Sequence, residues 1–446
     1  MYEEIVNYID AHLDSSIKAL KKLVSIPSVA AKGEGIDEAA ELVERMLADV
    51  GLETQIHETS GSPVVTGWLD VGAKRTLLFY DHYDVQPAEP FDLWDSPPFE
   101  PEIREERLWG RGVADNKGDT TSRIWTIKAF KETGTELPVN IKFVIEGEEE
   151  IGSVHLSEYT EKNKDFITAD AGIWEFGGAD IKGIQEAWLG LKGIFFVELE
   201  VERLSRNMHS SLACVLPSAA FRLVWALNSL RDENNRILIE GFYDNIKPLS
   251  NGELDAIEKV DLHEEELKEV YAIDEYLNGL TGTELKKAYY GNPSCNICGI
   301  TCGYQGKGSM TVLPAKASVK IDFRLVEGMH PDDIHKKLRK HLDQHGFSDV
   351  KVTYFEGYPA AKTPIEHPFV KIVASANKQV FGDLVVHPTS PGSGPLYLFN
   401  DYVPMVSIGC GDYLGKAHSP NESIAIDNYR RAQHRIVAIM DKMSHW

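Results

Sequence analysis

Long apolar runs are absent from this sequence, and so is the basic start of a signal peptide. No run reaches the roughly 18 apolar residues that a membrane-spanning helix requires. The N-terminus instead reads MYEEIVNYIDAHLDSSIKAL, in which apolar residues recur at helical spacing. These features predict an amphipathic first helix, and we expect a cytoplasmic protein that does not bind membranes.

Basic residues are scarce relative to acidic ones. The chain has 46 Lys and Arg against 69 Asp and Glu, which gives a formal net charge of -23. A surface this negative repels phosphate backbones, so we expect no nucleic-acid partner. Most of these carboxylates would keep the protein soluble, although some can gather in a site that binds cations.

Cysteine is scarce as well, with five residues in the chain. Cys295, Cys298 and Cys302 lie close together, and a C-x-x-C pair can be redox-active or can hold zinc. The segment lacks the second Cys or His pair that a structural zinc site requires. We therefore expect free, reduced thiols, as is usual in the cytosol.

The rest of the composition is that of a globular protein with two or three domains. In the N-terminal part, strand-like apolar runs alternate with helical patterns: strands at 63–69, 76–80 and 139–145, and helices at 37–50 and 119–131. This alternation predicts an α/β domain with a mostly parallel central sheet.

The pattern changes near residue 189 and changes back towards the C-terminus. The intervening part predicts an α+β arrangement, with strands at 194–201, 318–325 and 350–355 and helices at 217–231, 263–277 and 331–345. We therefore predict one domain made of residues 1–188 and 358–446, interrupted by an inserted domain of residues 189–357.

Histidine and acidic residues follow several of the predicted strands. His82 and Asp84 stand two apart, so in an extended segment they face the same side and Asp84 can hold the ring of a metal-binding His82. A surface turn with an incidental histidine is the alternative. Glu175 ends another short apolar run, and Asp115 lies in a Gly-bracketed turn before a helix. In open α/β sheets, ligands bind beyond the carboxyl ends of strands.

The segment FVIEGEEEIGS adds Glu149 and Glu150 after a further apolar run. Its crowded carboxylates repel one another unless cations neutralise them, although a solvated acidic loop is the usual alternative. With a late histidine in GKAHSPNESI, the candidate metal ligands are His82, Asp115, Glu150, Glu175 and His418. Nitrogen and oxygen ligands of this mix suit zinc, manganese or cobalt. Two such ions can share a bridging carboxylate and activate a water between them.

The order of these motifs, H-x-D, D-N-K-G, E-E-x-G-S and H-S-P-N-E, resembles that of the M20 metallopeptidases, and most closely that of the dipeptidase branch. This family includes carnosine-type dipeptidases, glutamate carboxypeptidases, aminoacylases and deacylases. The resemblance implies a zinc-peptidase-like catalytic domain with helices on both faces of its sheet, and an inserted lid and dimerisation domain. It also implies two divalent metal ions per subunit, with zinc preferred and manganese or cobalt as alternatives.

The resemblance further implies a role for each candidate in the catalytic domain. His82 and Glu175 would bind one metal, Glu150 and His418 would bind the other, and Asp115 would bridge both.

Three more positions in the catalytic domain follow from the same resemblance. Glu149 would be the general base that takes a proton from the attacking water and passes it to the leaving amine. Asp84 would orient His82. The peptide bond before Asn116 is expected to be cis.

In the inserted domain, the resemblance points to His209, which would reach the site of a partner subunit and stabilise the oxyanion. Arg324 would bind the substrate carboxylate, since its planar fork matches a carboxylate. Thr311 and Ser393 would add further substrate contacts. A surface histidine and a structural salt bridge are the respective alternatives for His209 and Arg324.

We therefore expect a homodimeric enzyme that hydrolyses dipeptides or short peptides with a free C-terminal carboxylate. The alternative is an N-acyl-amino-acid deacylase with the same metal site. Glu175 stands where many dipeptidases carry Asp, and the loop around Ser393 lacks the Arg-Glu pair of carnosine-type enzymes. A non-catalytic scaffold on the same fold would lack a ligand or the base, and neither is missing.

Overall fold

The computed structural model describes residues 2–446, which form two compact units. The larger unit contains the chain up to Gly190 together with Lys362–Thr389 and Gly394–Trp446. The smaller unit contains Leu191–Ala361 and Ser390–Ser393. The return of this last short segment to the smaller unit is not visible in the sequence pattern. No helix among the described residues is long and apolar enough to cross a membrane.

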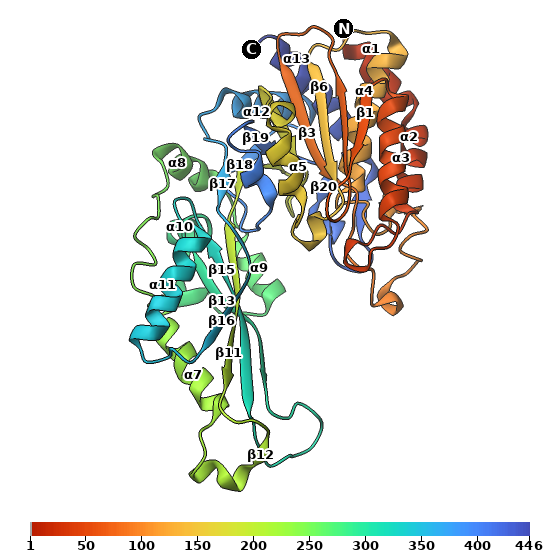
Figure 1. Ribbon diagram of the computed structural model, residues 1–446. Coiled ribbons are helices and arrows are strands. Elements are labelled where there is room, and N and C mark those ends of the chain that lie inside the picture. Colours follow the sequence, from red (N-terminus) through yellow and green to blue (C-terminus); the bar gives the residue numbers. More distant parts are fainter. Residues whose placement is uncertain (1) are drawn as a thin grey trace. The chain divides into compact units, whose positions relative to one another are not determined.

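A mixed sheet of ten strands forms the centre of the larger unit (Figure 1). Its order is β1-β2-β6-β3-β7-β19-β9-β8-β20, and β18 pairs with β9. The bounds are β1 (Glu53–His57), β2 (Val64–Leu69), β3 (Thr76–His82), β6 (Asn140–Glu146), β7 (Ala171–Trp174), β8 (Gly178–Ala179), β9 (Gln185–Trp188), β18 (Leu384–His387), β19 (Met405–Ser407) and β20 (Gly411–Asp412). The predicted α/β class is confirmed. The pairing is mixed, with the parallel strands β6, β3, β7 and β19 at the centre.

The central strands are buried, which explains their apolar sequences. Leu77, Leu78, Phe79 and Tyr80 of β3 have no exposed surface. Strands of parallel sheets are covered on both faces and so read as continuous apolar runs. The apolar pattern at 76–80 therefore identified a strand that lies deep in the unit.

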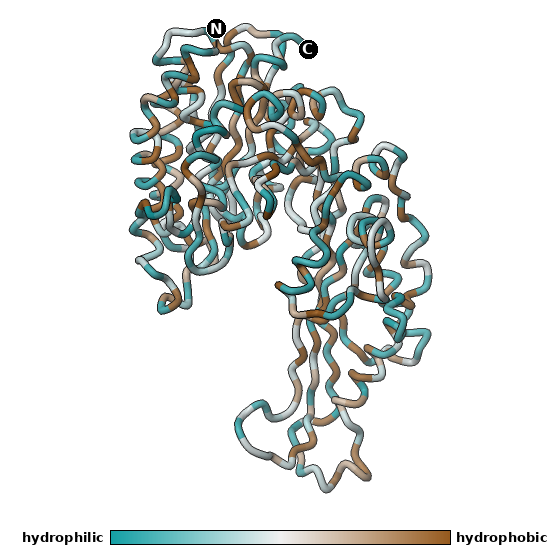
Figure 2. Tube along the Cα trace, turned by 180° about the vertical axis from the view of Figure 1, so that it is seen from behind, coloured by the Kyte–Doolittle hydropathy of each residue, from teal (hydrophilic) through white to brown (hydrophobic). Residues whose placement is uncertain are grey.

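Helices cover this sheet. They are α1 (Tyr2–Ala11), α2 (Leu13–Val24), α3 (Ile36–Asp49), α4 (Lys117–Thr133), α5 (Leu156–Lys162), α6 (Lys164–Ile167), α12 (Pro368–Val380) and α13 (Ile426–Ser444). Figure 2 shows hydrophobic and hydrophilic residues alternating in short bands along helices at the surface of this unit, as expected for helices with one buried face. The predicted first helix is in fact two helices. At His12 the backbone leaves helical geometry (φ −114°, ψ 16°), and the ring Nδ1 lies 2.9 Å from the carbonyl oxygen of Tyr8.

The smaller unit is built on a four-stranded sheet with the order β13-β15-β11-β16, in which all neighbours are antiparallel. The bounds are β11 (Gly193–Glu202), β13 (Ser294–Cys302), β15 (Lys316–Leu325) and β16 (Lys351–Tyr358). Helices α7 (Ala219–Leu230) and α11 (Pro331–Gln344) share a hydrophobic core with this sheet. Three further helices precede β13: α8 (Asn251–Lys259), α9 (Glu264–Tyr271) and α10 (Gly282–Gly291).

Strand β13 carries the three clustered cysteines and is not predicted by the sequence pattern. Six of its nine residues form one exposed run, so neither alternation nor an apolar run marks it. All five cysteines of the chain are free, as expected.

Candidate metal centre

Three neighbouring parallel strands bring three of the five predicted metal ligands to one edge of the larger unit's sheet. β3 ends at His82, and β6 leads into the short helix Glu149–Ile151. β7 is followed directly by Glu175. Because the strands are parallel, their carboxyl ends meet at the same edge.

The last two predicted ligands lie on loops that are joined by a separate three-stranded sheet. β5 (Arg107–Trp109) precedes the turn that carries Asp115, and β21 (Ser423–Ala425) follows the loop that carries His418. β5 and β21 pair antiparallel, so a loop near the C-terminus lies beside one that is distant in sequence.

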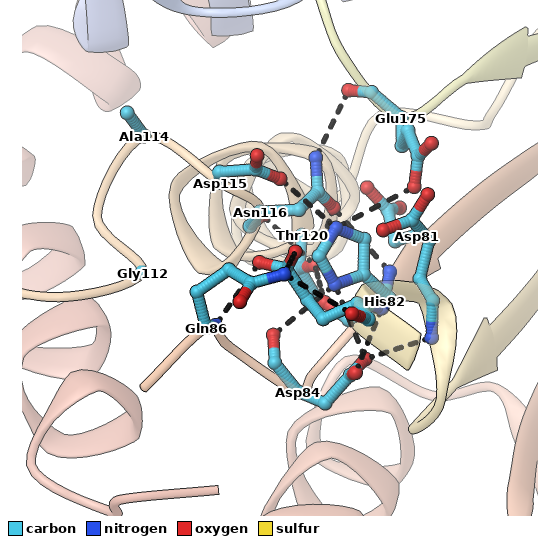
Figure 3. Close-up of polar contacts among 12 residues, drawn as sticks. Asp81, His82, Asp84, Gln86, Gly112, Ala114, Asp115, Asn116, Thr120 and Glu175 are labelled. Atoms are coloured by element: carbon cyan, nitrogen blue, oxygen red, sulfur yellow. Dashed lines mark hydrogen bonds and ion pairs between the residues drawn. The ribbon is translucent and has the colours of Figure 1, made fainter. Parts of the chain in front are cut away.

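One group of ligand atoms surrounds the ring of His82 (Figure 3). Its Nε2 lies 3.0 Å from Oδ1 of Asp115 and 3.5 Å from Oε2 of Glu175. His82 is fully buried, and Oε2 of Glu175 is a buried oxygen without a hydrogen-bond partner. A buried carboxylate oxygen that lacks a partner is costly unless a cation or proton neutralises it. The geometry therefore fits a cation between these three side chains.

A second group surrounds His418. Its Nε2 lies 3.0 Å from Oδ2 of Asp115 and 3.0 Å from Oε2 of Glu150. The two carboxylate oxygens of Asp115 therefore face different histidines. This is the arrangement that a carboxylate bridging two ions requires.

Glu149 also reaches the first group. Ligand atoms of His82, Glu149 and Glu175 lie within 4.8 Å of one another, and so do those of His82, Asp115 and Glu150. Glu149 is thus close enough to act on a molecule held in the site, and its geometry is also compatible with metal binding.

Electrostatic interactions in the cluster favour a bound cation. Burial raises the pKa of Glu149 and of Glu175 well above the usual range, and the neighbouring carboxylates raise both further. Burial alone would lower the pKa of His82, but contacts with Asp115 and Asp84 raise it. Contacts with Asp115 and Glu150 raise the pKa of His418 to about 10. Protons are thus retained where the carboxylates crowd, and divalent ions would replace them.

Asp84 lies behind the ring of His82 and supports two ligands. Its Oδ1 is 3.3 Å from His82 Nδ1, and its backbone oxygen is 3.1 Å from the same nitrogen. Its carboxylate also accepts hydrogen bonds from the backbone N–H groups of Glu149 and Glu150. Asp84 therefore directs Nε2 of His82 towards the site and fixes the acidic loop beside it.

Sequence reasoning missed three residues that hold the candidate ligands in place. The Asn116 side chain donates to the backbone oxygen of Glu175 and accepts from the backbone N–H of His82. Gln86 Nε2 donates to Oε2 of Glu150 at 3.0 Å. The bond between Asp115 and Asn116 is cis, as expected.

The third missed residue is Glu422, which is fully buried. Its carboxylate accepts from the backbone N–H groups of Gly112, Ala114 and Asp115 at 2.8–3.1 Å. It also forms an ion pair with the buried Arg111. Glu422 is the last residue of the H-S-P-N-E motif. The motif was recognised in the sequence, but no role was predicted for this glutamate.

In the smaller unit, the predicted residues form two pairs. His209 Nε2 lies 3.3 Å from Oγ1 of Thr311, and Nδ1 accepts from the backbone N–H of Ser211. Arg324 Nη1 donates to Oγ of Ser393 at 2.7 Å. The structure thus brings His209 next to Thr311 and Arg324 next to Ser393.

Residues 78–442 match the peptidase family M20/M25/M40. The chain belongs to this family. Human Beta-Ala-His dipeptidase is 31% identical over 77% of this chain and 71% of that protein. The Cys-Gly metallodipeptidase dug1 of Schizosaccharomyces pombe is 28% identical over 96% of this chain and 95% of that protein. The crystal structure of the M20 family metallo-carboxypeptidase Sso-CP2 from Sulfolobus solfataricus is 37% identical, with a TM-score of 0.93, and the match covers 97% of this chain and 99% of that one. The resemblance to M20 metallopeptidases is thereby confirmed.

Proposed function

We propose that this M20 family member hydrolyses the peptide bond of dipeptides or short peptides that carry a free C-terminal carboxylate. One observation supports this proposal above all others. Two histidine–carboxylate groups share Asp115, and a further carboxylate, Glu149, stands beside them. The names of the relatives, two dipeptidases and a carboxypeptidase, agree with this substrate class.

His82, Asp115 and Glu175 would hold one divalent cation. Asp115, Glu150 and His418 would hold the other. The mixture of imidazole and carboxylate suits zinc, with manganese or cobalt as alternatives. When bound, such a pair of ions polarises a carbonyl group and lowers the pKa of water towards neutrality.

Glu149 would move the proton. The attacking water forms a bond to the carbonyl carbon and gives its proton to the Glu149 carboxylate. The same proton then passes to the amine nitrogen as the carbon–nitrogen bond breaks. Burial raises the pKa of Glu149, which makes its carboxylate a stronger proton acceptor than an exposed one. The hydrogen bonds from the backbone of Glu149 and Glu150 to Asp84 would keep this side chain in place.

The smaller unit would supply the groups that recognise substrate. Arg324 would bind the terminal carboxylate together with Ser393, whose hydroxyl it already contacts. Because Nδ1 of His209 accepts a hydrogen bond, a neutral His209 carries its proton on Nε2. That N–H is a donor which would stabilise an oxyanion, with Thr311 as a second polar contact.

We further propose that the enzyme is a homodimer formed through the smaller unit. Phe221, Val224 and Trp225 of α7 lie at helical spacing and are 62%, 55% and 57% exposed. Exposed apolar patches of this kind are typical of protein interfaces. Trp225→Glu should convert the dimer to a monomer in sedimentation analysis, whereas a wild-type protein that sediments as a monomer would contradict the proposal.

A cytoplasmic location would fit the free cysteines. Cys214 and Cys298 are exposed and unpaired with another cysteine. Exposed thiols persist in a reducing compartment and tend to oxidise elsewhere. Cell fractionation of a tagged protein tests this part of the proposal.

The experiment for the main proposal is a substrate panel. The protein is stripped with a chelator, reloaded with zinc, manganese or cobalt, and offered dipeptides, longer peptides and N-acyl amino acids. Metal-dependent cleavage of dipeptides would support the proposal. Turnover of N-acyl amino acids alone would favour the deacylase alternative, with which Glu175 is also compatible. No turnover with both metals bound would refute the proposed substrate class.

A further inference from the structure

The smaller unit contains a pocket of about 770 Å³ beside Arg324. Its walls come from α9, from α10, from the segment between these helices and from the start of β13. Every lining residue belongs to the smaller unit, so the pocket is formed by this unit alone. Its volume lies within the range of about 300–1,000 Å³ that is typical of sites for small molecules.

Most of the pocket wall is apolar or aromatic. Leu267 and Tyr271 contribute from α9, Leu285 and Ala288 from α10, and Tyr276 from the segment between them. Such surfaces gain free energy by removing apolar ligand groups from water. An aliphatic or aromatic group is therefore the part of a ligand that this wall would bind.

The charged groups of the pocket are all cationic. They are Lys192, Arg231 and Arg324, and none of the described lining residues is Asp or Glu. This is notable in a chain with a net charge of -23. Lys192 donates to the backbone oxygens of Tyr289 and Asn292, both at 2.8 Å. Burial, and then the charge of Arg324, lower the pKa of Lys192 to about 8. The pocket thus combines an apolar wall with three cationic side chains, of which Arg324 also forms an ion pair with Asp322 (Nε to Oδ2, 3.4 Å), a residue that does not line the pocket.

We infer that this pocket binds the side chain of the substrate's carboxyl-terminal residue and selects large apolar or aromatic side chains. The inference rests on the proposed function, in which Arg324 holds the terminal carboxylate. Because the side chain and the carboxylate share one carbon atom, a carboxylate on Arg324 places the side chain next to Arg324 as well. Arg324 and the apolar wall line the same pocket, so a side chain that enters the pocket from Arg324 meets this wall. The preferred substrates are then dipeptides that end in leucine, methionine, phenylalanine or tyrosine.

The size of the expected preference in kcat/KM follows from the burial of the substrate side chain. One methylene group in an apolar pocket changes kcat/KM by about 10- to 200-fold. We therefore expect Ala-Leu and Ala-Phe to be cleaved with a kcat/KM at least about tenfold higher than that of Ala-Gly. Cleavage of Ala-Asp tests the alternative, in which the lysine and arginine side chains of the pocket bind an acidic side chain of the substrate.

Two variants test whether this pocket is responsible. Ala288→Trp adds bulk to the pocket wall from α10, where Ala288 is half-buried, and Tyr271→Ala removes an exposed part of the wall. Both should lower the ratio of kcat/KM for Ala-Phe to that for Ala-Gly by about tenfold or more. Lys287→Trp is the matched control, because it adds the same side chain on the same helix at a residue that does not line the pocket.

The outcomes separate this inference from the proposed function. Cleavage of all dipeptides at similar rates, a preference for Ala-Asp, or an unchanged ratio in Ala288→Trp would overturn the inference and leave the proposed function standing. If the zinc-loaded protein cleaves no dipeptide, the proposed function fails. The pocket is then tested by calorimetric titration with L-phenylalanine and with glycine. Tighter binding of L-phenylalanine that is lost in Ala288→Trp would support the inference, and equal binding would overturn it.

Discussion

Replacing Glu149 by Gln separates proton transfer from metal binding. The change keeps the shape of the side chain but removes its charge and its ability to accept a proton. Glu149 lies within reach of His82 and Glu175, and its carboxyl has a raised pKa because of burial and then of neighbouring carboxylates. It could thus be either the base of the proposed reaction or an additional metal ligand. The two roles predict different results for the same variant.

If Glu149 is the base, kcat should fall by about 100- to 10,000-fold, which is the usual contribution of a positioned acid–base group. At about 1.4 kcal/mol per factor of ten, this loss raises the barrier by about 3–5 kcal/mol. Metal content should stay at the wild-type level. The neutral amide removes one negative charge beside the site and so weakens the attraction for cations, but all five proposed ligand side chains remain, so the ions should be retained when metal is supplied in excess.

Steady-state kinetics on the best dipeptide, together with metal analysis by mass spectrometry, measure both quantities. Glu161→Gln serves as the control, because it makes the same chemical change at an exposed position of α5. A Glu149→Gln enzyme with near-normal kcat would refute the assignment of the base. Loss of one metal ion would show instead that Glu149 is a ligand.

Three further predictions concern other residues. Asp115→Ala should release both metal ions, because each of its carboxylate oxygens faces a different histidine; retention of two ions in metal analysis would contradict bridging. His209→Ala should lower kcat by about 100- to 1,000-fold with little change in KM, as expected when an oxyanion donor is removed, and a normal kcat would exclude His209 from the reaction. Glu422→Gln should weaken zinc binding by about 10- to 100-fold in competition with a chelator, because it disrupts the hydrogen bonds that fix the Asp115 turn. Glu422→Asp should restore part of that affinity, and unchanged affinity in Glu422→Gln would show that the turn holds its shape alone.

The central strands of the larger unit could be predicted because they are buried on both faces. The apolar runs at 76–80 and 139–145 correspond to β3 and β6, and both end where candidate ligands begin. A parallel sheet then brings those ligands together without any information on long-range contacts. The smaller unit's β13 was missed because its exposed Cys, Gly and Asn residues carry no strand pattern.

The residues that support the ligands could not be predicted in this way, and the reason is physical. A candidate metal ligand can be recognised from its residue type and from its position after a strand. A residue that holds such a ligand in place is defined only by the backbone groups with which it forms hydrogen bonds. Glu422 shows the difference. Its carboxylate satisfies three backbone N–H groups of a turn that lies more than 300 residues earlier in the chain. The pairing of β5 with β21 brings the two segments together, and nothing in either segment alone specifies that pairing. A buried carboxylate without such partners would be strongly destabilising, so the turn and Glu422 depend on each other. The proposed metal ligands Asp115 and His418 flank this contact, one on each segment, so Glu422 helps to hold them side by side although it is not one of the proposed ligands.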